Sequence, residues 1–286
     1  NAIVNYLDRK TQQIQEFIAK KERLIELLEE KRKVVISTRL SFKEGAKTYD
    51  TKIDWIGEIP DNWKVLNLKY LLKAKLKYGA NEEAKDANIN EPRYIRITDF
   101  GFDGKLHEDT FRSLPLKKAK DYLLEEGDIL FARSGATVGK AFQFKNYNGV
   151  ACFAGYLIKA TPKENEILSD FLYLYTQSSF FETWKSQTFN QATIENIGAD
   201  KYAVLKVIVP PIAYQSEIIK QAKNDNLQFE KVISKAQIEI EKAKEYQESL
   251  ITQVVSGQLK VPEKTYSNVH YREFDMVAEQ GSYYHT

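Results

Sequence analysis

The chain contains one stretch of sequence twice, and the copies lie on either side of a segment with a different composition. At a constant offset of 215 residues, Ile18 corresponds to Ile233 and Glu30 to Glu245, and this register is kept over a whole helix length. Repetition at a fixed period is the sequence signature of a repeated structural unit. The repeat therefore predicts two equivalent arms around one domain, an arrangement typical of a chain that holds something at a fixed distance.

Both copies have the hydrophobic spacing of a coiled coil. In residues 1–40 and 212–257, apolar residues recur at steps of three, four and seven, and Lys and Glu fill many of the other positions. Two prolines precede the second copy and Gly257 follows it, as is usual at the ends of a helix. We therefore predict two long coiled-coil helices. Taken alone, each copy is also typical of an oligomerisation stalk, but the repeat across a domain disfavours that interpretation.

Composition limits the remaining possibilities. The 286 residues are 43% hydrophobic, enough for a packed core, and the formal charge of +2 by itself predicts no partner. One cysteine, Cys152, and three histidines exclude an internal disulfide and a tetrahedral zinc cluster. The sequence has no run of about 18 apolar residues, the length that a membrane helix needs. We therefore expect a cytoplasmic protein without a structural metal or a membrane segment.

Between the arms, residues 41–211 are richer in glycine, aromatic and β-branched residues. Short apolar runs bounded by glycines predict strands, and helical spacing predicts short helices between them. This order favours a mixed α+β domain over regular βαβ units. We assign no function to the tail at 258–286. The expected strands are 94–98, 128–133, 140–144, 151–160 and 203–209, and the expected helices are 68–76, 116–122 and 169–185.

The chain has none of the common catalytic signatures. It lacks a nucleophile elbow, a Walker loop, a dinucleotide-binding fingerprint and a zinc-protease helix motif, and it also lacks the motifs of an amino-methyltransferase. A metal-dependent nuclease pattern is formally matched by Pro60, Asp61, Glu83 and Lys85, in which two carboxylates would hold Mg²⁺. So loose a pattern is common by chance. We therefore expect no catalytic residue and no metal site in this chain.

Three segments have residue types that bind nucleic acid. The first is a basic stripe at 64–78 that has no acidic residue and alternates with aromatic residues, and it includes Lys69, Lys73, Lys75 and Lys77. Lysines in such a stripe neutralise phosphates and give salt-dependent affinity. An ordinary solvated helix face has the same pattern, so both interpretations stay open.

The other two segments are polar loops. Residues 133–140 form a loop with two glycines, which allow close approach of a ligand to the backbone, although a tight hairpin would have the same composition. Residues 189–197 are rich in side-chain amides, which can bind adenine bidentately, although a capped turn is the alternative there. The candidate side chains of the two loops are Arg133, Ser134, Thr137, Lys140, Asn190 and Gln191.

Four motifs follow one another along nearly the whole chain. The entry motif at 54–63 reads DWIGEIPDNW, the central motif at 126–135 reads EGDILFARSG, and the exit motif at 191–197 reads QATIENI. The fourth motif is in the two arms, which read IVNYLDRKT at 3–11 and LITQVVSG at 250–257. Together these motifs resemble the specificity subunit of type I restriction-modification enzymes.

This resemblance implies a target recognition domain at 41–211, flanked by conserved spacer helices at 1–40 and 212–257 that pair as an antiparallel coiled coil. In the family, two recognition domains each read one half of a split DNA target, and the helices set the distance between the half-sites and dock methyltransferase subunits. One recognition domain is present here. The chain therefore resembles the C-terminal half of such a subunit, and a second recognition domain is expected before Asn1.

The resemblance also implies partners and cofactors. The specificity subunit itself is not catalytic: modification subunits methylate adenine with S-adenosylmethionine, and restriction subunits are motors that cleave DNA with ATP and Mg²⁺. The expected partners are therefore double-stranded DNA, modification subunits and restriction subunits in a bacterial or archaeal cytoplasm, and self-pairing through the coiled coil stays open. The alternative is a coiled-coil adaptor whose middle domain binds another protein and has no DNA role.

The resemblance changes what single residues imply. Trp55, Ile59 and Trp63 become packing residues at the domain entry, which places Asp61 in a structural motif. Arg133 lies in a shared motif, and a residue shared by a family cannot read a variable target, so a structural role stays open for it. The predicted DNA-binding residues are Lys69, Lys73, Lys75, Lys77, Arg133, Ser134, Thr137, Lys140, Lys185, Gln187, Asn190 and Gln191.

Overall fold

The structure is a computed structural model that describes residues 2–41, 45–101, 106–135, 137–190 and 196–261. The chain divides into two compact units. The first unit, Asn1–Leu24 with Lys235–Thr286, contains the distal parts of both arms, and the second unit is Ile25–Ser234.

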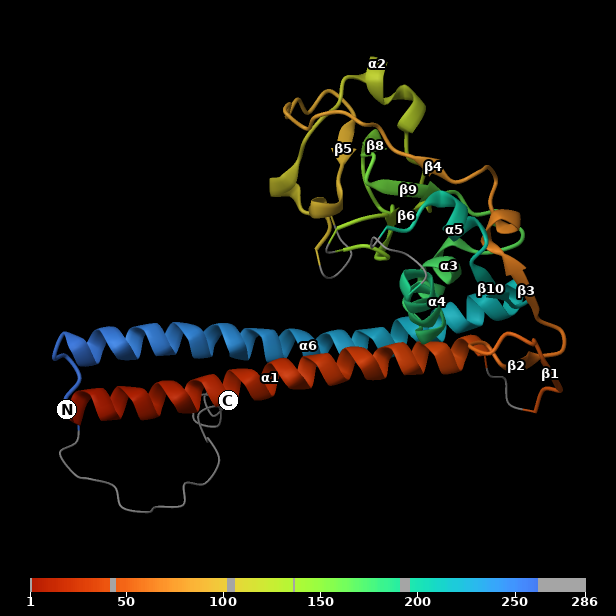
Figure 1. Cartoon of the computed structure of the whole chain (residues 1–286). Helices are drawn as coiled ribbons and strands as arrows, with labels where there is room; N and C mark the ends of the chain where they lie inside the picture. Colours follow the sequence, from red (N-terminus) through yellow and green to blue (C-terminus); the bar gives the residue numbers. More distant parts are fainter. Residues whose placement is uncertain (1, 42–44, 102–105, 136, 191–195, 262–286) are drawn as a thin grey trace, which may run out of the picture. The chain divides into compact units, whose positions relative to one another are not determined.

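The two copies of the repeat form helices α1 (Ala2–Ser41) and α6 (Ile212–Val255), drawn in red and blue in Figure 1. The predicted seam is mostly buried on α6 and mostly half-buried on α1. On α6, for example, the seam residues Ile233, Ala236 and Ile240 are all buried. The prediction of two long helices with a coiled-coil seam is therefore confirmed.

In the first unit the two helices run antiparallel. Ile14 of α1 packs in one buried cluster with Leu250 and Val254 of α6. Further along α1, Lys21 Nζ lies 2.7 Å from a carboxylate oxygen of Glu239. Residue numbers therefore fall along α6 as they rise along α1, which is the orientation that the family resemblance implies.

In the second unit, polar contacts join the same two helices. Arg39 donates a hydrogen bond from Nε to Asp225 and another from Nη1 to Gln221 Oε1, at 2.8 Å. Arg32, two helical turns earlier, donates from Nε to Asn226 Oδ1 at 2.9 Å. Polar pairs of this kind favour one register of a helix pair over the alternatives. The two arginines therefore fix how α1 and α6 align beside the domain.

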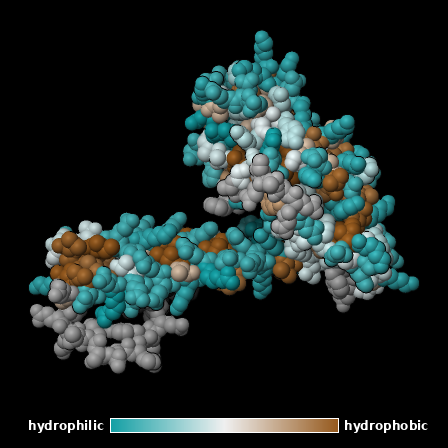
Figure 2. Space-filling view, viewed as in Figure 1, coloured by the Kyte–Doolittle hydropathy of each residue, from teal (hydrophilic) through white to brown (hydrophobic). Residues whose placement is uncertain are grey.

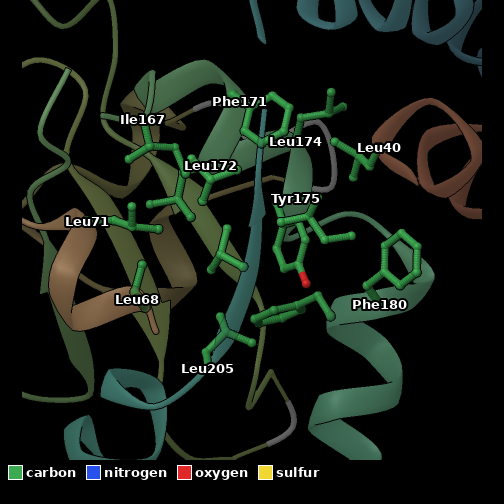
Figure 3. Close-up of a cluster of buried hydrophobic side chains, with 14 of the residues drawn as sticks. Leu40, Leu68, Leu71, Ile167, Phe171, Leu172, Leu174, Tyr175, Phe180 and Leu205 are labelled. Carbon is green, nitrogen blue, oxygen red and sulfur yellow. The ribbon is translucent and has the colours of Figure 1, made fainter. Parts of the chain in front are cut away.

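The core of the second unit includes residues from both long helices. Ile36 and Leu40 of α1 and Ile218 and Ala222 of α6 are buried in the same cluster as apolar residues of the domain. Figure 3 shows Leu40 directed toward this cluster. The boundary between the two units therefore falls inside both helices, whereas the sequence places the domain boundaries at their ends.

A four-stranded antiparallel sheet is the largest sheet among the described residues, with strand order β4-β9-β6-β7. Its central strand β6 is buried along its whole length, because clusters of apolar side chains cover both faces. The strands of this sheet are β4 (Lys77–Tyr78), β6 (Ile129–Ala132), β7 (Ala141–Gln143) and β9 (Leu157–Ala160).

Three two-stranded sheets, four short α-helices and four 3₁₀ turns complete the described part of the domain. The pairs β1-β2 and β3-β10 are antiparallel, and β5-β8 is parallel. This mixture confirms the expected α+β class. The remaining elements are β1 (Thr48–Asp50), β2 (Glu58–Pro60), β3 (Lys64–Asn67), β5 (Arg93–Ile95), β8 (Ala151–Phe153), β10 (Lys206–Val209), α2 (Leu116–Ala119), α3 (Ser169–Tyr175), α4 (Ser179–Asn190) and α5 (Ala199–Ala203).

Two predicted elements are wrong because backbone pairing overrides local propensity. The helix expected at 68–76 is a single 3₁₀ turn, Leu68–Leu71, after which the Lys73 N–H donates to the Thr161 carbonyl at 2.8 Å. The strand expected at 151–160 is two strands, since β8 pairs with β5 whereas β9 pairs with β6. A turn between them allows the chain to change sheets.

Three boundaries also differ from the sequence expectation. The strand expected at 94–98 ends at Ile95, because Ile97–Asp99 form a 3₁₀ turn. The helix expected at 169–185 is interrupted between α3 and α4, where the Ser178 hydroxyl donates to the Tyr175 carbonyl at 2.6 Å. The strand expected at 203–209 begins only at Lys206, because Ala203 ends helix α5. Helix and strand propensities alone do not mark such breaks.

The entry motif packs as the resemblance implies. Ile59 and Trp63 are buried in the main core cluster, and Trp55 packs against it while partly exposed. Leu68 and Leu71, which follow in the 3₁₀ turn, lie in the same cluster (Figure 3). The packing role predicted for Trp55, Ile59 and Trp63 is therefore confirmed.

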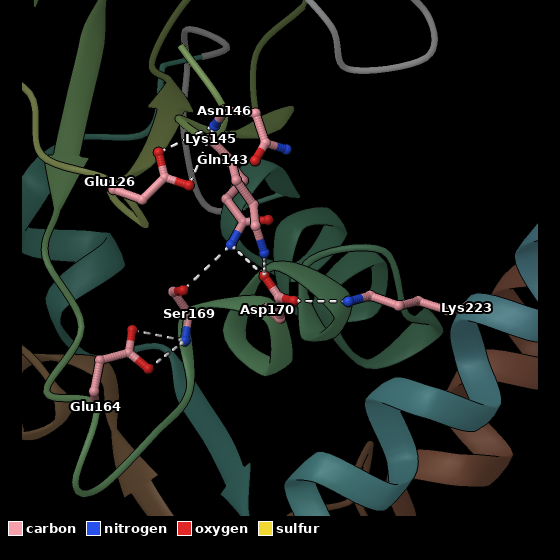
Figure 4. A network of polar contacts seen from close by, with 8 residues as sticks. All are labelled: Glu126, Gln143, Lys145, Asn146, Glu164, Ser169, Asp170 and Lys223. Carbon is pink, nitrogen blue, oxygen red and sulfur yellow. Dashed lines mark hydrogen bonds and ion pairs between the residues drawn. The ribbon is translucent and has the colours of Figure 1, made fainter. Parts of the chain in front are cut away.

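Asp170 of α3 joins the sheet to the long helix α6 (Figure 4). Its carboxylate accepts hydrogen bonds from Gln143 Nε2 at 2.9 Å, Lys145 Nζ at 2.5 Å and Lys223 Nζ at 3.1 Å. Burial alone would raise the pKa of Asp170, but these donors outweigh burial and lower its pKa to about 2. The carboxylate is therefore charged at neutral pH and connects β7 with α6.

The first unit exposes apolar side chains near the end of the helix pair. Ile3, Val4, Ile251 and Val255 are all exposed, and Figure 2 shows a group of apolar atoms on the visible face of this unit. Within the described ranges, the helices are not long and apolar enough to span a membrane.

Candidate nucleic-acid interface

The predicted loop at 133–140 is a tight hairpin between β6 and β7. The Lys140 N–H donates to the Thr137 carbonyl at 2.9 Å, which closes the turn. Gly135 and Gly139 both have φ of +79°, a conformation that glycine adopts more readily than other residues. Of the two interpretations of this segment, a ligand-binding loop or a hairpin, the backbone therefore has the conformation of a hairpin. Its tip leaves Thr137 half-buried and Lys140 exposed.

Arg133, at the end of β6, is held against an aromatic ring. Its guanidinium carbon lies 4.8 Å from the centroid of Tyr78, and the Tyr78 hydroxyl in turn accepts the Ala199 N–H at 2.9 Å. The Arg133 N–H donates to the Tyr156 carbonyl at 3.0 Å. A cation over an aromatic face is attracted by the ring quadrupole. The structural role left open for Arg133 therefore has a physical basis.

Lys185 of α4 lies across the hairpin. A Cβ atom at Gly139 would come within 2.2 Å of Lys185 Cδ, so the hairpin and the lysine stem are in direct contact. Lys185 Nζ forms an ion pair with Glu182 at 2.8 Å. This contact makes Lys185 a residue that holds α4 against the hairpin. Gln187, two residues further along α4, is exposed.

The third predicted segment, 189–197, ends beside the same hairpin. Ser134 and Asn196 form an antiparallel β-bridge, so the end of this segment lies beside the hairpin, although Asn196 itself was not among the predicted site residues. Asn190 is the last residue of α4, and Gln191 lies outside the described residues.

The predicted lysines do not share one helix face: Lys69 lies in the 3₁₀ turn, Lys73 and Lys75 lie between that turn and β4, and Lys77 lies in β4. Lys69, Lys73, Lys75 and Lys77 are all exposed. Lys77, in the edge strand β4, donates to a main-chain carbonyl and has its ammonium 5.3 Å from the Tyr122 ring. Lys69 has its ammonium 4.9 Å from the Tyr70 ring but, among the described residues, forms no hydrogen bond to a carbonyl as Lys77 does, so Lys69, Lys73 and Lys75 are the better candidates for phosphate contacts.

The buried carboxylate of the central motif has a structural environment. Asp128 accepts the Glu125 N–H at 2.8 Å and the Thr161 hydroxyl at 2.5 Å, and it lies 3.5 Å from Lys159 Nζ. Burial raises the pKa of Asp128, while these partners oppose the rise. Asp128 closes the turn that leads into β6. This role in the turn explains why the central motif contains Asp128, so no catalytic role is needed to account for it.

The formal nuclease pattern is not assembled. Lys85 forms an ion pair with Glu83, and both side chains are about three-quarters exposed. Asp61 lies in the turn after β2, where its N–H donates to the Lys47 carbonyl at 2.9 Å. Among the residues that the structure describes, groups of three or more potential metal ligands do not occur. Asp61 therefore has a place in the entry motif, as expected.

The part of the chain that contains the hairpin and the exposed lysines matches a known sequence family. Residues 60–243, more than half of the chain, match the family described as the type I restriction modification DNA specificity domain. The chain belongs to this family. The specificity domain in this sense includes the whole hairpin region and most of helix α6.

Characterised relatives of this specificity domain are specificity subunits. The specificity subunit of the type I restriction enzyme MjaVIII of Methanocaldococcus jannaschii is 25% identical over 213 residues, which are 72% of this chain and 48% of that protein. The StySPI specificity subunit of Salmonella potsdam is 26% identical over 155 residues, 48% of this chain and 30% of that protein. The chain thus spans half or less of the length of these relatives.

Solved structures share the fold of the specificity domain. A chain from a structure of complex assembly and conformational transition of a type I R-M system matches with a TM-score of 0.60 and 16% identity, over 90% of this chain and 59% of that one. The HsdS subunit of Thermoanaerobacter tengcongensis matches with a TM-score of 0.50 and 16% identity, over 90% and 58% of the two chains. Each match extends over helix, domain and helix together.

One exposed residue of the specificity domain was not predicted as a site residue. Tyr156, in the turn between β8 and β9, is 66% exposed and lies next to Arg133. In the sequence it stands inside what looks like one continuous strand. The signal that could have separated it is Gly155, since a glycine within a strand pattern often marks a close backbone approach or a break.

Proposed function

We propose that this chain reads one half of a bipartite DNA target for a type I restriction-modification system. The observation that carries the proposal is the match of residues 60–243 to a DNA specificity domain. The hairpin at 133–140, the bridge from Ser134 to Asn196 and the exposed lysines support it, because they give one domain both polar loops and cations.

The helix pair has a separate role in this proposal. Helices α1 and α6 set the spacing between the half-sites and dock modification subunits, which in turn associate with restriction subunits. The chain itself is not catalytic and binds no cofactor, so S-adenosylmethionine, ATP and Mg²⁺ serve the partner subunits. If one chain carries a single recognition domain, a second copy that pairs through the coiled coil supplies the other domain. The assembly works in the cytoplasm.

The exposed lysines at 69, 73 and 75 give a quantitative test of DNA binding. The triple variant Lys69→Ala, Lys73→Ala and Lys75→Ala is expected to bind duplex DNA about ten-fold more weakly than the unchanged chain at physiological salt, because fewer phosphates are neutralised and fewer counterions are released. The slope of log affinity against log salt should fall by about 0.9 for each phosphate that the variant no longer neutralises. Fluorescence anisotropy with a labelled duplex pool at several salt concentrations measures both quantities.

A matched control removes three lysines from exposed positions of the long helices. The variant Lys20→Ala, Lys242→Ala and Lys244→Ala changes the net charge equally but should leave the affinity and the salt slope unchanged. Equal losses of affinity in the two variants would show that only net charge matters. No salt-dependent binding by the unchanged chain would contradict the proposed function and favour a protein-binding adaptor.

A further inference from the structure

Three neighbouring segments of the sheet bring two tyrosines and an arginine to one edge. Tyr78 ends β4, Arg133 follows β6, and Tyr156 precedes β9, and β9 lies between the other two strands. Tyr78 contacts Arg133 through its ring, and Tyr156 contacts Arg133 through its carbonyl. We name these three residues the Tyr–Arg edge.

The backbone under Tyr156 is fixed on both sides. The Gly155 N–H donates to the Ala80 carbonyl at 2.7 Å, and the Leu157 N–H donates to the Ala154 carbonyl at 2.9 Å. Ala154 and Leu157 are buried, whereas Tyr156 between them is 66% exposed. The ring is therefore presented by a rigid turn, and little backbone entropy would be lost when it binds.

The two aromatic residues of the edge have different surroundings. Tyr78 is 40% exposed, but its ring contacts the guanidinium of Arg133 and its hydroxyl accepts the Ala199 N–H, so both have partners within the domain. Tyr156 presents most of its side chain to solvent. Tyrosine combines an apolar ring with a polar tip and needs few rotatable bonds to be ordered. Tyr156 is thus the member of the edge that is available to a ligand.

We propose that Tyr156 contacts a base of the DNA half-site through its ring, and that Arg133 with Tyr78 positions the turn that carries it. This inference rests on the proposed function, because the ligand is the same duplex. The position of Arg133 supports this inference, because Arg133 begins the hairpin in which Ser134 forms a β-bridge with Asn196. In an intact duplex the ring can pack against a thymine methyl group or a base edge in the major groove, whereas a phosphate would engage only the hydroxyl, which Tyr156→Phe removes.

The affinity test uses the full chain and a labelled duplex pool. Tyr156→Ala should weaken binding about ten-fold without changing the salt slope, since no charge is removed. Tyr156→Phe should keep most of the affinity, because the ring remains. The matched control is Tyr246→Ala, which removes a 41% exposed tyrosine from helix α6, and it should change little.

A crosslinking test identifies the contacted group. In a duplex pool with 5-iodouracil in place of thymine, the iodine occupies the position of the thymine methyl group in the major groove. Irradiation should give an adduct on the peptide that contains Tyr156, and Tyr156→Ala should abolish it. Equal affinities of Tyr156→Ala and the unchanged chain, or a reduced salt slope in that variant, would overturn the inference alone. Absence of any DNA binding by the unchanged chain would overturn the proposed function and the inference with it.

Discussion

Replacing Gly79 with alanine is expected to destabilise the domain by about 3–5 kcal/mol, through overpacking and the loss of backbone hydrogen bonds. A Cβ atom at this position would lie 2.3 Å from the Ala154 carbonyl oxygen and 2.4 Å from that of Phe153. Both obstacles are main-chain atoms, so rotation of a side chain cannot relieve the overlap. The segments around Ala80 and Ala154 would have to separate, which breaks the hydrogen bond from Ala80 N–H to Phe153.

The facing segment offers a matched control for this substitution. A Cβ atom at Gly155 would lie 3.3 Å from the Ala80 carbonyl oxygen, which a shift of a few tenths of an ångström relieves. Gly155→Ala should therefore cost less than about 1 kcal/mol, since alanine also restricts the unfolded chain. Urea unfolding followed by circular dichroism measures both free energies. Similar losses of stability in the two variants would contradict the close approach at Gly79.

Phe131→Ala is expected to cost about 3–5 kcal/mol, the usual range for removing a large buried aromatic side chain. Phe131 of β6 is completely buried, and its ring stacks on Tyr202 at 4.4 Å and on Phe181 at 6.2 Å between centroids. Tyr202 donates its hydroxyl to the Ala132 carbonyl at 3.2 Å. The cavity would therefore lie directly under the strand that leads to Arg133, and DNA binding should weaken together with stability.

The comparison variant for this site is Phe131→Leu. Leucine fills much of the same volume, so a loss of only about 1–2 kcal/mol is expected. The same urea titration compares the two variants, and the slope of free energy against urea should be unchanged in both if unfolding stays two-state. A loss below about 1 kcal/mol in Phe131→Ala would show that the aromatic stack does not support β6.

The long helices and the domain entry could be predicted because their signals are local and repeated. The seam spacing marks α1 and α6, and Trp63 ends an entry motif whose Ile56 and Ile59 also pack in the core. The break between β8 and β9 could not be predicted in the same way. It depends on which strands pair with each half, β5 or β6, and pairing between distant segments leaves no periodicity in the sequence.

The candidate site was predictable only in part, for a related reason. The hairpin glycines and Arg133 stand out in the sequence, and the structure brings Ser134 beside Asn196. Which cations are engaged within the domain is a tertiary property: Lys77 donates to the main-chain carbonyl of Asp121, which is far from it in the sequence. Exposure of a single tyrosine is likewise set by how the chain turns between sheets. The contacts that decide these roles join residues far apart in sequence.

The most direct test of a recognition role is the methylated sequence in cells that express the complete restriction-modification system. Residues 41–211 of this chain would be replaced with the corresponding domain of another specificity subunit, while α1 and α6 are kept. Sequencing of methylated adenines should then show that one half of the bipartite site has changed, whereas the other half and the spacing are retained. A methylated site that stays the same after the exchange would contradict a recognition role for this domain.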